Sequence, residues 1–256
     1  MSRRTATRRV IETAMPPAPT WDDLVEALAP EIWLKFDEAD GSLINHGSWN
    51  DPDTGIESLG QSGDGSEMTY EQEGAFAVDE AILFSGTESY FRAATDPNNY
   101  SATGGTVAFL VKFSITTPVW FGGWSQGSDV QACSFRTQSS GRFQIFLSSN
   151  GTNDSAITSQ VSIADDAWHL VILDFTGSST PLMYLDGALV STDTLTNVTP
   201  LSYWLNDFNP DEFTMGVRPG LNDTADYNGL MDEFFYLDGD HLTTQQIADL
   251  ATAAGV

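Results

Sequence analysis

The sequence of 256 residues is poor in cysteine, in lysine and in long apolar runs. Cys133 is its single cysteine, so no disulfide can form within the chain. Secreted domains of this size often carry disulfides, which indicates that this fold does not depend on oxidation. No apolar run approaches the ~18 residues needed to span a membrane, and the arginine-containing N-terminus lacks the apolar core of a standard signal peptide. We therefore expect no membrane insertion.

Positive charge is scarce as well. The chain has 10 Lys and Arg against 36 Asp and Glu, a net charge of −26. Four of the basic residues, Arg3, Arg4, Arg8 and Arg9, lie within the first nine positions, where there is no acid, so the remainder carries a net charge of −30. Such a body repels nucleic acid and anionic membranes, and we expect no nucleic-acid partner. We interpret it as a solubilising surface suited to a salty medium, where screening reduces self-repulsion.

Residues 1–19 form a separate segment, in which the basic cluster is followed by Met15-Pro-Pro-Ala-Pro19. The prolines favour an extended, polyproline-like linker. Two interpretations stay open: a disordered tail, which is the usual state of such termini, or an arm whose four arginines bind an acidic surface of a partner. We assign residues 1–19 to a basic, proline-rich arm and residues 20–256 to one globular domain.

Within the domain, short apolar segments alternate with turns, and helices are expected only near its two ends. Thr20 is placed to cap a helix over residues 20–29, and Thr243 with Gln246 predicts a capping box before a C-terminal helix. Strands are expected at residues 31–38, 81–86, 88–92, 106–113, 120–124, 134–137, 142–147, 168–175, 182–185, 188–190, 213–217 and 229–237. Short strands separated by turns predict an all-β fold, a sandwich of two antiparallel sheets.

Three expectations concern pairing and packing. The strands at 81–86 and 88–92 are expected to pair as a hairpin. The strand that starts at Trp168 is nearly all apolar, so we expect it to be central, with Trp168 between the sheets beside Phe109 or Phe234. Asp232 and Glu233 are neighbours on the last strand, so they are expected to point to opposite faces.

Three segments together resemble a known family. Residues 229–250 have the pattern Gly-x-hydrophobic-Asp-Glu, then a strand, then Leu-Thr-x-x-x-Ile; residues 166–174 contain a Trp-His strand, and residues 183–187 contain a Tyr-x-Asp-Gly hairpin. With these motifs the chain resembles the laminin-G-like domains of the concanavalin A-like lectin/glucanase superfamily. The resemblance implies a jelly-roll sandwich. It leaves function open, because this fold hosts lectins, glycosidases, adhesion modules and inert spacers.

The sequence carries no recognisable catalytic pattern. Catalytic members of the resembling superfamily commonly have Glu-x-Asp-x-x-Glu or a close variant on one strand, and this chain has none. Glycosidases need two carboxyl groups facing one cleft, yet no expected strand has acids two or four positions apart in its interior. A nucleophile elbow, a zinc spacing, a phosphate loop and a dinucleotide fingerprint are also missing. We therefore expect a protein that is not an enzyme.

Calcium is the one metal that the sequence leaves open. Laminin-G-like domains often hold a single Ca²⁺ with loop oxygens, and Asp223 with Asp226 could supply such ligands. Similar loops lie at residues 96–99 and 206–211. The alternative is that these Asn and Asp residues only stabilise turns, and no other cofactor is expected.

Sugar binding is the second open possibility. Exposed aromatic rings can stack on sugar rings, and several aromatic residues lie near expected loops. These candidates are Trp124, Tyr203, Trp204 and Tyr227. The alternative for each of them is packing in the core of the sandwich.

These features together predict a non-catalytic module for recognition or assembly. Resembling domains occur in tailed-phage decoration, tail and fibre proteins. A virion subunit fits four features of the chain: the missing signal peptide, the single cysteine, the basic arm and the acidic exterior. We expect such a subunit to be oligomeric in its particle and docked to other virion proteins by its arm. The alternative is an extracellular or cell-surface adhesin that binds glycans, such as those of a host surface. A glycan-active enzyme ranks third.

Overall fold

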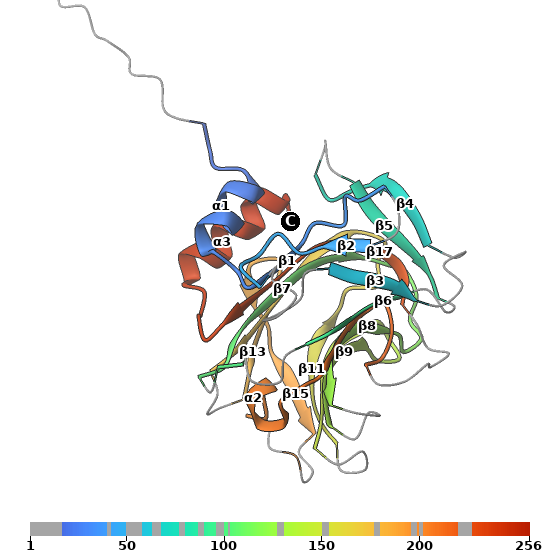
Figure 1. Ribbon diagram of the computed structural model, residues 1–256, viewed down its shortest axis with the longest axis vertical. Coiled ribbons are helices and arrows are strands. Elements are labelled where there is room, and N and C mark those ends of the chain that lie inside the picture. Colours follow the sequence, from blue (N-terminus) through green and yellow to red (C-terminus); the bar gives the residue numbers. More distant parts are fainter. Residues whose placement is uncertain are drawn as a thin grey trace, which may run out of the picture.

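A computed structural model describes residues 17–39, 42–49, 68–76, 80–86, 90–95, 100–101, 103–126, 131–149, 154–176, 180–195, 199, 202–219 and 227–256, and the backbone of residues 58–62. The described residues form two antiparallel sheets packed face to face, with three helices, and this confirms the predicted β-sandwich (Figure 1). The arm residues Arg3, Arg4, Arg8 and Arg9 lie outside the described residues, so the arm stays a prediction.

Helices α1 (Trp21–Leu28) and α3 (Thr244–Ala254) lie side by side, while the short α2 (Leu205–Phe208) lies far from them (Figure 1). Both longer helices begin where the sequence predicts. The Thr20 hydroxyl accepts a hydrogen bond from the Asp23 amide at 3.2 Å, and Thr243 accepts one from the Gln246 amide at 3.2 Å. Each pair forms a reciprocal capping box, which fixes the helix start locally. None of the described helices is long and apolar enough to cross a membrane.

Helices α1 and α3 pack on one sheet, which we call the covered sheet. Its strands run in the order β14-β13-β12-β7-β17-β5-β4, and β1 pairs with β17. They are β1 (Ile32–Leu34), β4 (Met68–Glu73), β5 (Glu80–Ser85), β7 (Gly105–Lys112), β12 (Trp168–Phe175), β13 (Leu182–Leu185), β14 (Ala188–Leu189) and β17 (Asn228–Asp238).

We call the other layer the open sheet, because none of the described helices packs on its outer face. Its order is β15-β11-β10-β9-β8-β16-β6-β3-β2. Its strands are β2 (Ser42–Ile44), β3 (Ser58–Ser62), β6 (Tyr90–Ala94), β8 (Trp120–Gln126), β9 (Gln131–Thr137), β10 (Arg142–Ser148), β11 (Ser155–Ser162), β15 (Thr192–Leu195) and β16 (Glu212–Met215).

Alternation along the strands divides the apolar residues between two clusters. On β7, Val107, Phe109 and Val111 enter the core between the sheets. Ala108 and Leu110 on the same strand face the helices. The outward residues of the covered sheet are therefore buried as well, whereas those of the open sheet face away from the core.

Trp168 does not pack between the sheets, and that expectation is wrong. On β12, Val171 and Leu173 enter the core, while Leu170 and Ile172 face the helices. Trp168 is in phase with the second pair and lies partly buried at the margin of the helix-side cluster. The strand itself is interior, between β7 and β13. An all-apolar strand gives no signal of which set of side chains faces inward.

The expected hairpin at residues 81–86 and 88–92 is also wrong. Strand β5 lies in the covered sheet between β17 and β4, whereas β6 lies in the open sheet between β16 and β3. The chain crosses from one sheet to the other between them. Two adjacent apolar strands look the same locally in a hairpin and in a crossover.

A β-bulge changes the direction of the acids on β17. The register with β7 shifts between Asp232 and Phe234, and Glu233 has a φ of 46°. Both acids consequently find partners on the helix side of the sheet. Asp232 accepts a hydrogen bond from the Ala75 amide at 2.7 Å, and Glu233 accepts one from Trp33 Nε1 at 2.6 Å. The expectation of opposite faces fails because a bulge places an extra residue in one strand.

Candidate ligand-binding face

The outer face of the open sheet carries a row of polar and aromatic side chains. The strand register places five residues beside one another on five adjacent strands, β8 to β15. In order across the sheet they are Trp120, Arg136, Gln144, Thr158 and Asp193. Cross-strand neighbours lie close enough for their side chains to interact, so this row acts as one continuous strip.

A second row runs parallel to the first and consists mainly of small and apolar residues. Across the same strands it contains Gly123, Ser134, Phe146, Ala156 and Leu195. Ser134 is buried, and its hydroxyl has no hydrogen-bond partner among the described residues. At the other end of the row Leu195 is 64% exposed. The two rows together combine an apolar contact surface with polar groups, as ligand sites commonly do.

A groove of about 220 Å³ lies over these rows. Its lining residues are Arg136, Gln138, Arg142, Gln144, Phe146, Asp154, Ala156, Thr158, Asp193, Thr194 and Leu195. We call it the Arg136 groove. Its volume is large enough for about one sugar residue, with further units extending into solvent.

Trp120 and Phe146 form an aromatic platform beside the groove. Their rings meet edge to face with centroids 5.6 Å apart. The Arg136 guanidinium carbon lies 4.8 Å from the Trp120 centroid and 4.4 Å from the Phe146 centroid, and that of Arg218 lies 5.0 Å and 6.0 Å from them. The guanidinium groups thus gain cation–π stabilisation, and the platform fixes their position.

A chain of hydrogen bonds orients Arg136. Its Nε donates to Gln144 Oε1 at 2.5 Å, and Gln144 Nε2 donates to Thr158 Oγ1 at 2.6 Å. Burial, and then the neighbouring charge of Arg218, lowers the pKa of Arg136 to about 10. Arg136 therefore remains charged at neutral pH, although it is partly withdrawn from water.

The far end of the groove is held by an ion pair. Arg142 binds Asp193, and its Nε also donates to the Ser159 carbonyl at 2.5 Å. The hydrogen bonds from Arg142 and then from Gln160 hold the pKa of Asp193 below its usual range. Asp193 is therefore ionised and cannot serve as a proton donor near neutral pH.

The four aromatic residues that the sequence offers for sugar stacking are buried in the core. Trp124, Trp204 and Tyr227 are fully buried and Tyr203 is 8% exposed, which supports core packing for each of them. The Tyr227 hydroxyl donates to the Leu230 carbonyl at 2.8 Å. Their ring faces cannot meet a sugar, so the expectation of a stacking site at these residues is corrected.

Trp120, on the same strand as Trp124, faces outward instead. Trp120 and Trp124 are four positions apart, so strict alternation would place them on one face. The register with β9 shifts between Trp120 and Gly122, and this bulge puts the two rings on opposite faces. The Gly122-Gly123 pair in the middle of a strand is a signal of such a bulge, and sequence reasoning missed it.

The candidate calcium ligands Asp223 and Asp226 lie outside the described residues, as does the loop at 96–99. In the third loop, Asp207 accepts a hydrogen bond from the Trp204 amide at 2.7 Å and so caps α2. A different group, Asp37, Glu38 and His46, has possible ligand atoms all within 4.8 Å of one another. Asp37 and His46 are exposed, and such surface groups are common in acidic proteins.

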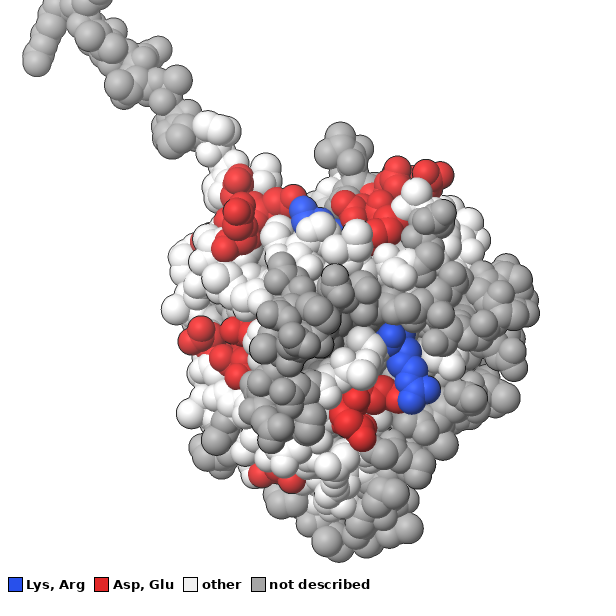
Figure 2. All heavy atoms as spheres, viewed as in Figure 1, with Lys and Arg blue, Asp and Glu red and all other residues white. Residues whose placement is uncertain are grey.

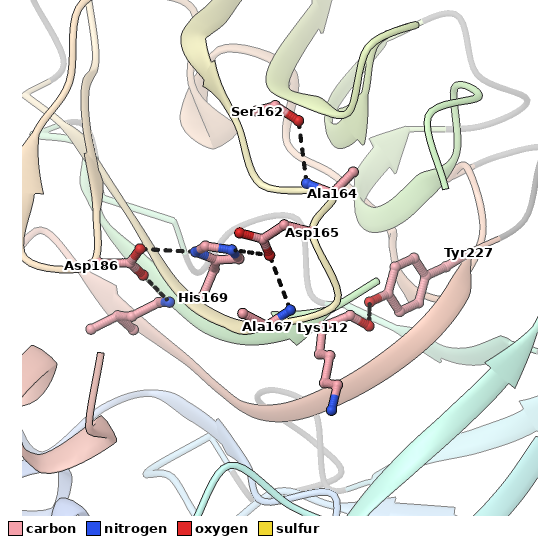
Figure 3. A network of polar contacts seen from close by, with 9 residues as sticks. Lys112, Ser162, Ala164, Asp165, Ala167, His169, Asp186 and Tyr227 are labelled. Carbon is pink, nitrogen blue, oxygen red and sulfur yellow. Dashed lines mark hydrogen bonds and ion pairs between the residues drawn. The ribbon is translucent and has the colours of Figure 1, made fainter. Parts of the chain in front are cut away.

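His169 lies in a polar network where the chain enters β12 (Figure 3). Its Nδ1 is 2.8 Å from Asp186 and its Nε2 is 2.9 Å from Asp165, with the ring held between the two carboxylates. The hydrogen bond to Asp186 is the largest cause that raises the pKa of His169. Asp186 also accepts from the Leu170 amide at 3.0 Å, so the network ties the β13–β14 turn to β12 and has a structural role.

Larger hollows of about 430 and 440 Å³ flank Lys35, beside helix α1. Three of their charged groups, those of Lys35, Asp22 and Glu233, are held by contacts within the protein. Lys35 pairs with Asp22 at 2.6 Å and lies 4.4 Å from the Trp33 ring centroid, while Glu233 bonds Trp33. These groups join α1 to the covered sheet, so the Arg136 groove is the better candidate for a ligand.

The two packed sheets define a class of protein, the jelly-roll sandwich, here with helices α1 and α3 on the outer face of one sheet. The model of the concanavalin A-like lectin/glucanases superfamily matches residues 85–248, and the chain belongs to this superfamily. The resemblance seen in the three sequence motifs is thereby confirmed. No match was found among curated proteins.

Solved structures share the fold at low sequence identity. Domain 4 of AbnA, an extracellular GH43 arabinanase from Geobacillus stearothermophilus, solved in complex with arabinotriose, is 18% identical with a TM-score of 0.60, and the match covers 87% of this chain and 98% of that domain. The binding domain of botulinum neurotoxin serotype D/C is 13% identical with a TM-score of 0.61, over 88% of this chain and 52% of that one. A botulinum neurotoxin type C structure, whose cell entry depends on two ganglioside molecules, is 13% identical with a TM-score of 0.61, over 88% and 51%. This chain spans about half the length of these toxin chains.

Proposed function

We propose that the chain is a non-catalytic recognition domain that binds a saccharide in the Arg136 groove. The observation that carries the proposal is the pairing of an aromatic platform with oriented polar groups on an open sheet. Phe146 is partly exposed and offers an apolar surface, while Arg136, held in place through the buried Gln144 and Thr158, offers hydrogen-bonding groups. Sugars present both apolar ring faces and hydroxyl groups, so this combination suits them. Structural neighbours that bind arabinotriose or gangliosides support the same class of ligand.

Three carboxylates, those of Asp193, Asp232 and Glu233, favour binding without turnover. A glycosidase needs a protonated general acid whose pKa is raised. In the groove the pKa of Asp193 is lowered by its partners, chiefly Arg142. On β17, Asp232 and Glu233 hold the Ala75 amide and the indole of Trp33. A screen for reducing-end release from glycans tests this part, and turnover that vanishes on mutation of one acid would contradict it.

Glycan binding is tested with the purified protein on a glycan panel, followed by titration calorimetry of the hits. Phe146→Ala should weaken binding by about 3- to 10-fold, because an aromatic contact is removed. Leu189→Ala is the matched control: Leu189 is 60% exposed and lies on the opposite sheet, so its loss should leave affinity unchanged. Equal affinity of the Phe146 variant and the wild type would refute the groove as the site.

We further propose a setting for this domain: a virion, where residues 1–19 dock it to a neighbouring protein, and the alternative is the cell surface. The support is the contrast between the basic arm and the acidic body. On the face seen in Figure 2, acidic side chains of the described residues are visible in more places than basic ones. Deletion of residues 2–18 should abolish incorporation into particles and leave the thermal unfolding midpoint nearly unchanged. Normal incorporation of the truncated protein would refute the arm's role.

A further inference from the structure

Two positive charges lie over one aromatic ring in a protein that is otherwise strongly acidic. The guanidinium carbons of Arg136 and Arg218 lie 4.8 Å and 5.0 Å from the Trp120 centroid. They are therefore no more than about 10 Å apart, about one Debye length, and they repel each other. Burial is the larger cause that lowers the pKa of Arg136, and this repulsion is the second. An anion bound at Arg136 would reduce this repulsion.

Arg136 retains unused hydrogen-bonding capacity. Its Nε is engaged by Gln144, and its terminal nitrogens have no partner in the described part of the chain. Asp154, another lining residue, attracts Arg136 without forming an ion pair with it, and Asp193 is held by Arg142. The two carboxylates of the groove lining therefore do not occupy the guanidinium. A planar guanidinium binds a carboxylate or a sulfate through two parallel hydrogen bonds.

We infer that the saccharide bound in the Arg136 groove is anionic, and that its carboxylate or sulfate group pairs with Arg136, near the charge of Arg218, while its ring lies against Phe146. This inference rests on the proposed glycan-binding function and specifies its ligand class. The body outside the first nine residues has a net charge of −30, which repels polyanions. The groove therefore suits an acidic sugar in a short or mostly neutral glycan better than a long acidic polymer.

The test compares three trisaccharides that differ in charge: trigalacturonate, a sulfated galactotriose and neutral galactotriose. Binding to the full-length protein is measured by titration calorimetry. At least one anionic trisaccharide should bind about tenfold more tightly than the neutral one, the factor expected for a charge-assisted contact. Which of the two binds distinguishes a carboxylate ligand from a sulfate ligand.

Variants locate the anion. Arg136→Gln keeps a polar side chain but removes the charge, and it should weaken anionic binding by about tenfold or more. Arg218→Gln is a second variant, used in case the first one misfolds, and circular dichroism checks both. Lys112→Gln is the matched control, since it makes the same change in net charge on the covered sheet, and its affinity should stay within about twofold of the wild type.

The outcomes separate the inference from the proposed function. Equal binding of neutral and anionic trisaccharides, lost in Phe146→Ala, would overturn the inference and leave the glycan-binding function standing. Anionic binding that is unchanged in both arginine variants would also overturn it. Failure of the whole glycan panel to bind would overturn both.

Discussion

Trp124 should be the more costly of two tryptophans to remove, although both lie on apolar strands. It is fully buried between the sheets, and its ring centroid lies 4.7 Å from that of Phe213 and 5.4 Å from that of Tyr236. Large-to-small core substitutions of aromatic residues cost about 3–5 kcal/mol, so we expect Trp124→Ala to cost about 4 kcal/mol. Trp168 is partly exposed at the edge of the helix-side cluster, and Trp168→Ala should cost about 1–2 kcal/mol.

A third variant separates the ring from its polar atom. Trp124 Nε1 is buried and has no hydrogen-bond partner among the described residues. Trp124→Phe keeps most of the packing and removes this unpaired donor, so it should cost about 1 kcal/mol or less.

Urea unfolding followed by far-ultraviolet circular dichroism measures all three free energies. For a domain of this size about 4 kcal/mol corresponds to a fall of about 8–16 °C in the thermal midpoint. A cost of Trp124→Ala below about 1 kcal/mol, the range of ordinary surface changes, would refute the assignment of this ring to the core. If Trp168→Ala costs as much as Trp124→Ala, the assignment of Trp168 to the helix-side face of β12 is refuted.

Three further predictions concern backbone, charge and metal. Gly123→Ala should destabilise the protein by more than about 3 kcal/mol, because a Cβ at this residue, whose φ is 138°, would overlap the Cys133 carbonyl oxygen. Gly255 has open space around it, so Gly255→Ala should cost only about 1 kcal/mol, and equal costs of the two variants in chemical unfolding would contradict this prediction. His169→Gln should cost more stability at about pH 5.5 than at about pH 9. Because the pKa of His169 is raised in the folded protein, its stabilising effect is complete below the unfolded pKa near 6.5 and is lost as the pH rises through the folded pKa. A cost that does not depend on pH would contradict a charged His169 in this network. A calcium titration decides between the two interpretations of the loop at Asp226. If the loop binds Ca²⁺, the ion raises the thermal midpoint of the wild type but not that of Asp226→Asn; if the loop is only a turn, calcium changes neither midpoint.

Local features of the fold could be predicted from the sequence, and bulges could not. The capping boxes at Thr20 and Thr243 depend on residues three positions apart, so short-range pattern identifies them. The outward direction of Trp120 depends on an extra residue in β8, which shifts the phase of every side chain after it. Strict alternation would place Trp120 and Trp124 on one face, so it does not identify Trp124 as the ring that lies in the core.

The candidate site escaped sequence analysis because it is assembled across strands. Arg136, Phe146, Thr158 and Asp193 come from four strands, and only the register between those strands brings them together. One signal was present in the composition: in an acidic body with six basic residues, three of the arginines line or flank one groove. Because basic residues are rare in this body, their gathering on one sheet indicates a candidate site once the strand register is known.

The alternation of the open sheet has a consequence for how such a domain can change over evolutionary time. On β10, Phe143, Ile145 and Leu147 fill the core, whereas Gln144 and Phe146 between them face the groove. A substitution at every second residue of the strand therefore changes the packing of the core, whereas a substitution at a residue between them changes the groove. A descendant of this gene could exchange its ligand through substitutions at the intervening positions while the interior stays the same. Repertoires of related domains with different specificities can arise in this way from a single scaffold.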